Sequence, residues 1–282
     1  MHILTNIDSL KQFVDRYKIE KKRIGFVPTM GALHEGHLSL VRQAQQDCDI
    51  VVCSIFVNPT QFNNSKDLEN YPITIEQDSK LLEEQACDIL FLPSAKEMYP
   101  NGLTTNTYLL NGIDKMLEGR KRPGHFDGVC TIVHRLFSIV EPNAAFFGEK
   151  DFQQLAIIKQ MVQSLSLPID IKSGITIREK NGLAKSSRNK LLTASQQQKA
   201  SQIYDSLIKV KSLYGQLDNE EIKEKIGLEI NQTEEMKLDY IAIVKPHTFE
   251  PIIGKAQKQE ARVLIAVFLG NVRLIDNLSL ND

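Results

Sequence analysis

The stretch that decides the fold is IGFVPTMGALHEGHLSLV, residues 24–41. It opens with the apolar run 24–27, which is typical of a buried strand, and a turn with Gly31 and Gly36 follows. Apolar side chains then recur at helical spacing, at Leu38, Leu40, Val41 and Ala44. The stretch therefore predicts a strand, a glycine-containing turn and an amphipathic helix.

The same alternation continues over the first two-thirds of the chain. Apolar runs predict strands at 49–57, 88–92, 144–147 and 169–177. Amphipathic or apolar segments predict helices at 74–86, 129–140 and 151–165. Strands that alternate with helices indicate a parallel sheet with helices on both faces, so we expect an α/β fold.

The pattern changes near residue 178. Helices are predicted at 194–213 and 218–230, followed by strands at 238–244, 262–269 and 272–276. Consecutive strands after consecutive helices are typical of a small α+β domain. We therefore expect two domains, 1–177 and 178–282.

Composition excludes several classes of function. Of 282 residues, 34 are Lys or Arg and 35 are Asp or Glu, and this net charge of −1 disfavours a nucleic-acid partner. The longest apolar run, 263–269, is far shorter than the about 18 residues that span a membrane. Cysteines lie in apolar runs without CxxC spacing, which favours buried, reduced thiols. We expect a soluble cytoplasmic protein that binds neither nucleic acid nor membrane.

Polar motifs follow several of the predicted strands, and parallel sheets bind ligands at the carboxyl ends of their strands. After the first strand, His34 and His37 stand three apart at a helix start, where free N–H groups and the helix dipole favour an anion. Two imidazoles there can donate to phosphate oxygens. A zinc site is a weaker alternative because the i, i+4 histidine spacing is absent. A polar turn without special function also remains open.

Three further segments carry candidate chemistry and ordinary alternatives. Lys150 in GEKDFQQ suits a phosphate, whereas Asp151 can cap a helix or hold a ribose hydroxyl or a metal. The loop 185–189 places two hydroxyls beside an arginine, as a triphosphate requires, but also reads as a solvated loop. Gln61 in NPTQF can bind a small polar substrate or merely end a turn. The segment 122–129 predicts a rigid turn leading into a helix, and neither GxxxxGK[ST] nor GxGxxG occurs.

Together these motifs resemble a known family. The sequences PTMGALHEGHLSLV, FVNPTQF, RPGHFDGV, FFGEKDFQQL, SSRN and RLIDN are similar, in this order, to those of the pantothenate synthetases (pantoate–β-alanine ligases). The resemblance runs from about residue 20 to the end. It implies a Rossmann-like ATP- and pantoate-binding domain, 1–177, and a smaller lid domain, 178–282.

The resemblance also implies the reaction. Pantoate attacks the α-phosphorus of ATP with Mg²⁺ present, giving pantoyl adenylate and pyrophosphate. The amine of β-alanine then attacks the acyl carbon, releasing AMP and pantothenate, the vitamin B5 precursor of coenzyme A. The family enzymes are homodimers.

Site residues follow from the same resemblance, position by position. The implied ATP-binding residues are Met30, Gly31, Ala32, Leu33, His34, Glu35, Gly36, His37, Gly148, Glu149, Lys150, Asp151, Ile177, Lys185, Ser186, Ser187 and Arg188. Those implied in catalysis are His34, His37, Lys150, Ser186, Ser187 and Arg188, with His37 in the proton-donor position. Gln61 and Gln154 match pantoate-binding residues, and Gln61 also faces β-alanine. No metal ligands are assigned.

Three positions depart from the family pattern. Lys185 stands where the family has Met before SSRN, Ile73 replaces Arg after Tyr-Pro, and Val272 replaces Thr before RLIDN. One alternative function is an adenylylating transferase of the same superfamily that acts on another small acid. Another is a nucleotide-binding regulatory protein that has lost the chemistry. The presence of His34, His37, Lys150 and Arg188 disfavours it.

Overall fold

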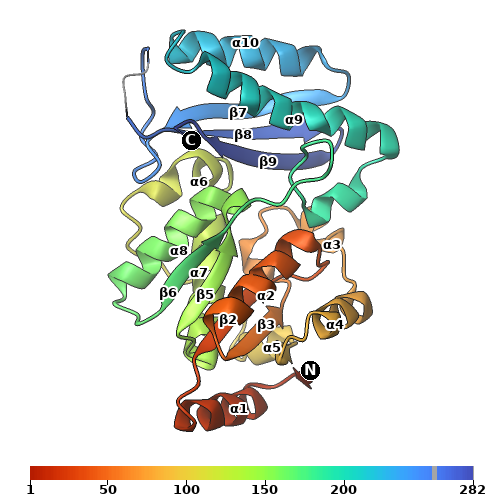
Figure 1. Cartoon of the computed structure of the whole chain (residues 1–282), viewed down its shortest axis with the longest axis vertical. Helices are drawn as coiled ribbons and strands as arrows, with labels where there is room; N and C mark the ends of the chain where they lie inside the picture. The colour runs from red at the N-terminus through yellow and green to blue at the C-terminus, as the bar shows by residue number, and fades with distance from the viewer. Residues whose placement is uncertain (256–258, 282) are drawn as a thin grey trace. The chain divides into compact units, whose positions relative to one another are not determined.

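The computed structural model, which describes residues 1–255 and 259–281, contains two compact units (Figure 1). The first comprises Met1–Glu149 and Gln153–Ile175, and the second comprises Lys150–Phe152 and Thr176–Asp282. The chain thus belongs to the second unit over Lys150–Phe152, returns to the first, and leaves it again after Ile175.

The first unit is built on six parallel strands in the order β1-β4-β3-β2-β5-β6. The strands are β1 (His2–Leu4), β2 (Ile24–Thr29), β3 (Ile50–Ile55), β4 (Ile89–Phe91), β5 (Ala144–Gly148) and β6 (Asp170–Gly174). The helices are α1 (Ile7–Ile19), α2 (Glu35–Asp47), α3 (Ser65–Glu69), α4 (Ile75–Glu84), α5 (Ala95–Met98), α6 (Leu117–Lys121), α7 (His125–Val140) and α8 (Phe152–Ser164). Short 3-10 helices lie at η1 (Pro59–Gln61), η2 (Ile113–Lys115) and η3 (Glu149–Asp151), and the chain enters the second unit within η3 and leaves it after the first residue of α8.

Helices cover both faces of this sheet, as the sequence predicts. All six residues of β3 are buried, and consecutive strand residues point to opposite faces. Helix α2 packs across β2, β3, β5 and β6, whereas α7 contacts β2 and α1. After β4 the chain returns to β5, on the other side of β2, so the direction of winding reverses beside β2. Parallel sheets bind ligands at such a reversal.

Several elements of the first unit differ from the sequence prediction. Strand β6 ends at Gly174 rather than at residue 177, and α3, α5 and α6 were not predicted. Strand β1 and helix α1 were not predicted, although the Asn6 side chain accepts a hydrogen bond from the Ser9 backbone and caps the helix. Helix α7 begins at His125 rather than at Val129. The preceding Gly124 adopts a left-handed conformation (φ 78°), so the rigid turn ends there and its last residues form the first helical turn.

The second unit has its own core. Its sheet is antiparallel in the order β7-β8-β9, with β7 (Met236–Val244), β8 (Arg262–Leu269) and β9 (Val272–Ser279). Helices α9 (Ala194–Leu213) and α10 (Asn219–Gln232) lie over one side of the sheet (Figure 1), and η4 spans Ser187–Leu191. Ala200, Ile203, Leu207 and Val210 recur at helical spacing and bury the inner face of α9.

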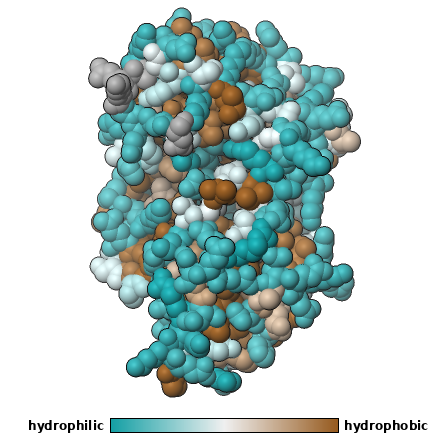
Figure 2. All heavy atoms as spheres, viewed as in Figure 1, coloured by the Kyte–Doolittle hydropathy of each residue, from teal (hydrophilic) through white to brown (hydrophobic). Residues whose placement is uncertain are grey.

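The burial of most thiols agrees with the composition. Cys53, Cys87 and Cys130 are buried and Cys48 is half-buried, all four without a disulfide. Burial raises the pKa of Cys87 and of Cys130 to about 12, which keeps both as thiols. Hydrophilic residues dominate the face seen in Figure 2, where apolar residues form separate small groups. In the described part of the chain, no helix combines the length and apolarity that a membrane crossing needs.

A glycine on α7 allows η1 to approach the helix closely. A Cβ atom on Gly128 would lie 2.5 Å from the Thr60 carbonyl oxygen. We expect Gly128→Ala to lower the free energy of unfolding by about 1–3 kcal/mol, because this backbone clash exceeds the helix-propensity gain of about 1 kcal/mol. Urea unfolding followed by circular dichroism measures the change.

Gly148→Ala is the matched control. A Cβ atom there meets nothing within 4 Å, and the backbone is outside the left-handed region. Its unfolding midpoint should equal that of the wild type. Equal midpoints for both variants would contradict the close-approach argument.

Candidate active site

Three candidate segments begin at the same edge of the parallel sheet. Strand β2 lies between β3 and β5, and all three run in the same direction. Their carboxyl ends lead into residues 30–37, 58–61 and 148–149 respectively. The topology of the first unit thus gathers these segments at the reversal point, which is where sheets of this kind usually bind ligands.

A buried carboxylate fixes the turn after β2. Gly31 and Ala32 both have positive φ, 83° and 49°, and the left-handed conformation is unfavourable for alanine. Asp78 on α4 is 1% exposed, and its two oxygens accept hydrogen bonds from the backbone N–H groups of Ala32 and Leu33, both at 2.8 Å. Thr74 Oγ1 also donates to Asp78 at 3.1 Å. The carboxylate therefore holds an otherwise strained backbone in place.

The two predicted histidines form the cap of α2. His34 is the N-cap residue, and its Nδ1 accepts from the Gly36 N–H at 3.2 Å. His37 Nδ1 accepts from the His34 N–H at 3.3 Å, and the two ring centroids lie 4.0 Å apart. A neutral imidazole that accepts at Nδ1 carries its proton on Nε2. Both rings are therefore set as Nε2–H donors at a helix N-terminus, which suits phosphate oxygens.

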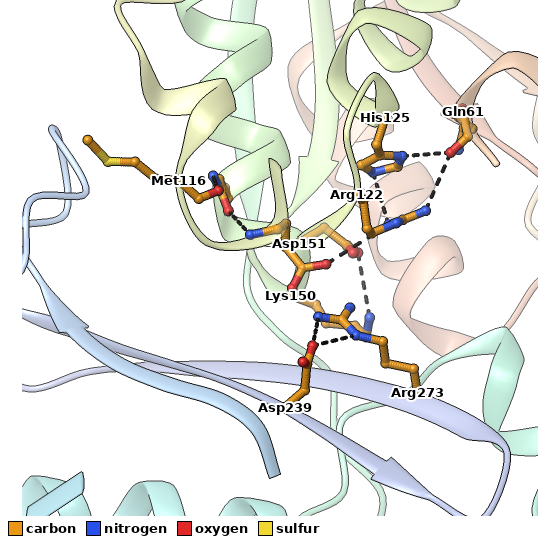
Figure 3. A network of polar contacts seen from close by, with 10 residues as sticks. Gln61, Met116, Arg122, His125, Lys150, Asp151, Asp239 and Arg273 are labelled. Carbon is orange, nitrogen blue, oxygen red and sulfur yellow. Dashed lines mark hydrogen bonds and ion pairs between the residues drawn. The ribbon is translucent and has the colours of Figure 1, made fainter. Parts of the chain in front are cut away.

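Gln61 is held by its backbone and by its side chain. Its carbonyl accepts from His125 Nδ1 at 2.8 Å and from Arg122 Nη2 at 3.4 Å (Figure 3). Its side-chain Nε2 lies 3.0 Å from Met30 Sδ, and Asn58 Nδ2 donates to its Oε1 at 3.2 Å. The structure thus brings two predicted site residues, Met30 and Gln61, into contact.

The neighbouring glutamines of α8 have different surroundings. Gln153 is buried, where its Nε2 donates to the carbonyls of Ile113 and Met116 and its Oε1 accepts from the Glu118 N–H. Its role is to tie α8 to η2 and α6. Gln154, the predicted substrate residue, is half-buried. Of these two glutamines, Gln153 therefore has its amide fully engaged within the fold, whereas Gln154 is less buried.

In the second unit, the neighbouring side chains of Lys150 and Asp151 form an ion pair. Lys150 Nζ lies 3.7 Å from Asp151 Oδ2 (Figure 3), and the lysine side chain is 20% exposed. The Lys150 carbonyl accepts a hydrogen bond from Asn277 Nδ2 on β9 at 3.0 Å. The preceding residues of the predicted ATP segment, Gly148 and Glu149, belong to the first unit.

A hairpin of the second unit joins two more predicted positions. The Lys185 N–H donates to the Ile177 carbonyl at 2.9 Å, so these residues are paired. Lys185 Nζ forms an ion pair with Glu179 at 2.8 Å, which partly neutralises the cation that departs from the family pattern. The following 3-10 turn is capped by Ser186 Oγ, which accepts from the Arg188 N–H, and Ser187 is buried. Residues 185–188 are thus an ordered, capped turn.

Several residues that hold these segments were not predicted, including Asp78, Asn58, His125, Asp276 and Asn277. Asp78 is 46 residues from Ala32, and Asn277 is 127 residues from Lys150. Local spacing contains no signal of such contacts. His125 and the RLIDN motif were visible as motifs but had no assigned role.

Metal-ligating side chains do not gather in the described part of the chain. Among residues 1–255 and 259–281, no three His, Cys, Asp or Glu side chains lie together in a manner that would hold an ion.

The Asp78 contact yields a direct test of the turn. We expect Asp78→Asn to lower the free energy of unfolding by about 1–3 kcal/mol, because an amide cannot accept both backbone N–H bonds and keep its own donors satisfied. Loss of the turn should also displace His34 and His37 and weaken ATP binding. Urea unfolding and ATP titration by calorimetry measure the two effects.

Asp88→Asn provides the matched control. Asp88 Oδ2 accepts from the Val51 N–H at 2.8 Å, near the amino end of β3 and therefore away from the carboxyl edge of the sheet. It should lower stability without changing ATP affinity. Unchanged ATP affinity in folded Asp78→Asn protein would contradict the proposed role of the turn.

Comparison with known proteins identifies the family. The family model described as "Pantoate-beta-alanine ligase" matches residues 2–279. A pantothenate synthetase from Thermotoga petrophila is 46% identical over 98% of this chain and 99% of its own length.

Solved structures agree with this match. A pantothenate synthetase from Thermus thermophilus superposes with a TM-score of 0.92 at 39% identity, covering 100% of both chains. A pantoate-beta-alanine ligase from Francisella tularensis, complexed with "Beta-gamma ATP and Beta-alanine", has a TM-score of 0.84 at 40% identity and covers 100% of this chain and 98% of that one. These similarities confirm the predicted fold class. With the histidine cap and the strand-end segments in place, the chain belongs to the pantoate–β-alanine ligase family.

Proposed function

We propose that this protein catalyses the reaction of its family, the ATP-dependent condensation of pantoate with β-alanine. In the first step, a pantoate carboxylate oxygen attacks the α-phosphorus of ATP, and the bond to the β-phosphate oxygen breaks with release of pyrophosphate. In the second step, the β-alanine amine attacks the acyl carbon of pantoyl adenylate, AMP departs, and the amine loses a proton. ATP is the co-substrate, and pantothenate, AMP and pyrophosphate are the products.

The histidine cap carries the proposal. His34 and His37 offer Nε2–H donors at the N-terminus of α2, where the helix dipole also favours negative charge. Charge that develops on the phosphates during attack is stabilised by such preorganised donors. We assign residues 30–37 to ATP and His37 to donation toward the leaving pyrophosphate.

We assign the two small substrates to neutral amide side chains of the first unit. Gln61 lies beside Met30 at the reversal point of the sheet, with its backbone fixed by His125. A fixed amide orients a hydroxyl or carboxylate without adding a charge. We assign pantoate to Gln61 and Gln154, and β-alanine to Gln61. Positioning two reactants in this way supplies much of the rate enhancement, and no covalent enzyme intermediate is required.

We assign further ATP residues beyond the turn after β2, of which Gly148 and Glu149 belong to the first unit and the others to the second. We assign Lys150 to a phosphate as a point charge, Gly148, Glu149 and Asp151 to the same segment, and Ile177 to the adenine. The turn with Lys185, Ser186, Ser187 and Arg188 is assigned to the triphosphate, which a guanidinium and hydroxyls suit. We propose that residues 178–282 act as a lid domain and that 1–177 form the ATP- and pantoate-binding domain.

Magnesium is proposed to enter with the nucleotide. Mg²⁺ in nucleotide enzymes is usually held by substrate phosphates and one or two carboxylates, so a cage of protein ligands is not required. Asp151, next to Lys150, is the carboxylate we would assign to it. The bound ion would neutralise phosphate charge and ease the departure of pyrophosphate.

Location and assembly are proposals of the same kind. Buried thiols without disulfides favour a reducing compartment, so we propose the cytoplasm. A homodimer is proposed from the family resemblance. An adenylylating transferase acting on another small acid is the second candidate, and a substrate panel distinguishes it from the first.

Isotope exchange tests the adenylate mechanism. The protein should exchange labelled pyrophosphate into ATP when pantoate is present and β-alanine is absent, because the first step is reversible and complete in itself. His37→Gln should slow this exchange by about 10²–10⁴-fold, the usual effect of removing a positioned donor.

His134→Gln is the control for this substitution, since His134 on α7 contacts Tyr108 and has no assigned role. It should exchange at the wild-type rate. Absence of exchange in folded wild-type protein would refute the proposed mechanism, and a near-normal rate for His37→Gln would remove His37 from it.

The unusual Lys185 gives a prediction specific to this chain. We expect Lys185→Met to change the KM for ATP more than kcat, because an added cation beside the triphosphate acts on binding. Steady-state kinetics with varied ATP measure both constants.

Glu179→Gln is the opposing variant. It removes the carboxylate that pairs with Lys185 at 2.8 Å, so it should shift the KM for ATP in the direction opposite to Lys185→Met. An unchanged KM for ATP in both variants would assign Lys185 to the hairpin alone.

A further inference from the structure

The RLIDN motif ends in two buried polar residues that the proposed chemistry does not use. Asp276 and Asn277 lie on β9, and each is 4% exposed. Buried polar groups are costly unless they are hydrogen-bonded, so their partners indicate their purpose. Those partners lie in the two parts of the second unit that contain proposed ATP residues.

Asn277 holds the turn that carries Lys150. Its Nδ2 donates to the Lys150 carbonyl at 3.0 Å, and its Oδ1 accepts from Arg262 Nη1 at 2.5 Å. The guanidinium of Arg262 in turn lies 3.9 Å above the ring of Phe152. Phe152 also packs on Phe249, with ring centroids 5.6 Å apart. One amide therefore connects both ends of the Lys150–Phe152 segment to the sheet.

Asp276 holds the hairpin that carries Ile177. Its carboxylate pairs with Arg178 in a fork, with Nη1 to Oδ2 at 2.6 Å and Nη2 to Oδ1 at 3.0 Å. Arg178 also donates to the Gly182 carbonyl at 3.0 Å and stacks on the Tyr204 ring at 4.1 Å. Since Arg178 follows Ile177 directly, the ion pair fixes the strand of the hairpin in which Ile177 pairs with Lys185.

The two anchors are also joined to each other. Asp276 Oδ1 accepts from the Asn277 backbone N–H at 2.8 Å. Adjacent strand residues are about 3.3 Å apart along the chain, and the strand is held in the sheet by β8. The position of the lysine turn is thereby set relative to the position of the hairpin within the second unit.

We propose that Asp276 and Asn277 are positioning residues for ATP, which hold the Lys150 turn and the Ile177 hairpin at a fixed separation. This inference rests on the proposed function, since it takes Lys150 and Ile177 as contacts of one nucleotide. Neither residue needs to touch ATP. Loosening either anchor removes no group that contacts ATP, but it lets the Lys150 turn or the Ile177 hairpin occupy a wider range of positions. Binding of a ligand that needs both segments is then weaker.

Asn277→Asp is the sharpest variant. It keeps the size of the side chain and the acceptor for Arg262, but it replaces the donor to the Lys150 carbonyl with an oxygen. The KM for ATP should rise about tenfold, the effect of losing one buried hydrogen bond, while the KM for β-alanine stays within about twofold. Amide hydrogen exchange without ligand should become faster in the peptide spanning residues 148–153.

Asn219→Asp is the matched control. Asn219 is a fully buried asparagine of the same unit, and its Nδ2 donates to the Ile252 carbonyl at 2.8 Å. The Asn219→Asp variant makes the same chemical change at a position that does not contact the Lys150 turn. It should lower the melting temperature but leave both the KM for ATP and exchange at 148–153 unchanged. Should Asn277→Asp not fold, Asn277→Ser removes the same amide donor and is measured in its place.

The outcomes separate the two proposals. Wild-type protein without ATP- and pantoate-dependent activity refutes the proposed function, and the hydrogen exchange of 148–153 still decides whether Asn277 holds the turn. Active wild type with an unchanged KM for ATP or unchanged exchange in the Asn277 variant overturns the positioning role alone. Asp276→Asn should likewise raise the KM for ATP, and it should speed amide hydrogen exchange in residues 176–188. Unchanged exchange in these residues would overturn the positioning role of Asp276.

Discussion

The proposed chemistry of the first unit depends on one buried carboxylate. Asp78 accepts two backbone N–H groups of the turn that links β2 to α2, and in doing so stabilises a left-handed alanine. A strained residue of this kind costs about 1–3 kcal/mol and persists only where its surroundings compensate for it. Hydrogen bonds to a charged acceptor are strong enough to do so. Because the turn is fixed, α2 begins at once, and its first residues are the two histidines.

The same turn determines which ring nitrogen of His34 and of His37 carries the proton. Each Nδ1 is engaged by a backbone N–H of the cap, so each proton lies on Nε2. His125 has the opposite arrangement, since its Nδ1 donates to the Gln61 carbonyl and its Nε2 faces Arg122. One imidazole therefore fixes the backbone at Gln61, whereas the two imidazoles at the start of α2 accept hydrogen bonds at Nδ1 from the backbone of the cap. Backbone contacts thus give these three histidines different hydrogen-bonding roles.

Charge in the second unit is balanced locally, which agrees with a net charge of −1. Lys150 pairs with Asp151, Arg178 with Asp276 and Lys185 with Glu179. Cations gathered for phosphate without such partners would repel one another in the absence of ligand. A phosphate that binds Lys150 therefore replaces one partner with another. The affinity for phosphate then depends on the difference in free energy between the two pairings rather than on the charge of Lys150 alone.

Sequence periodicity predicted most of the elements, because strands and helices in this chain bury regular apolar faces. The limits of α9 and β8 match those predicted, and the alternation up to β6 correctly indicated a parallel sheet. The candidate site could be predicted only where its residues are neighbours in sequence, as in the turn with His34 and His37, and those assignments stay predictions. Asp78 and Asn277 act on residues far along the chain, so no local pattern could reveal them.

The placement of Lys150 shows why such distant contacts matter. The chain passes from the first unit to the second after Glu149 and returns at Gln153, whose amide is locked by three hydrogen bonds to residues 113–118. The turn between these points is held by Asn277 and by the packing of Phe152. Lys150 is therefore held by contacts within the second unit, although Asn277 lies 127 residues away in sequence.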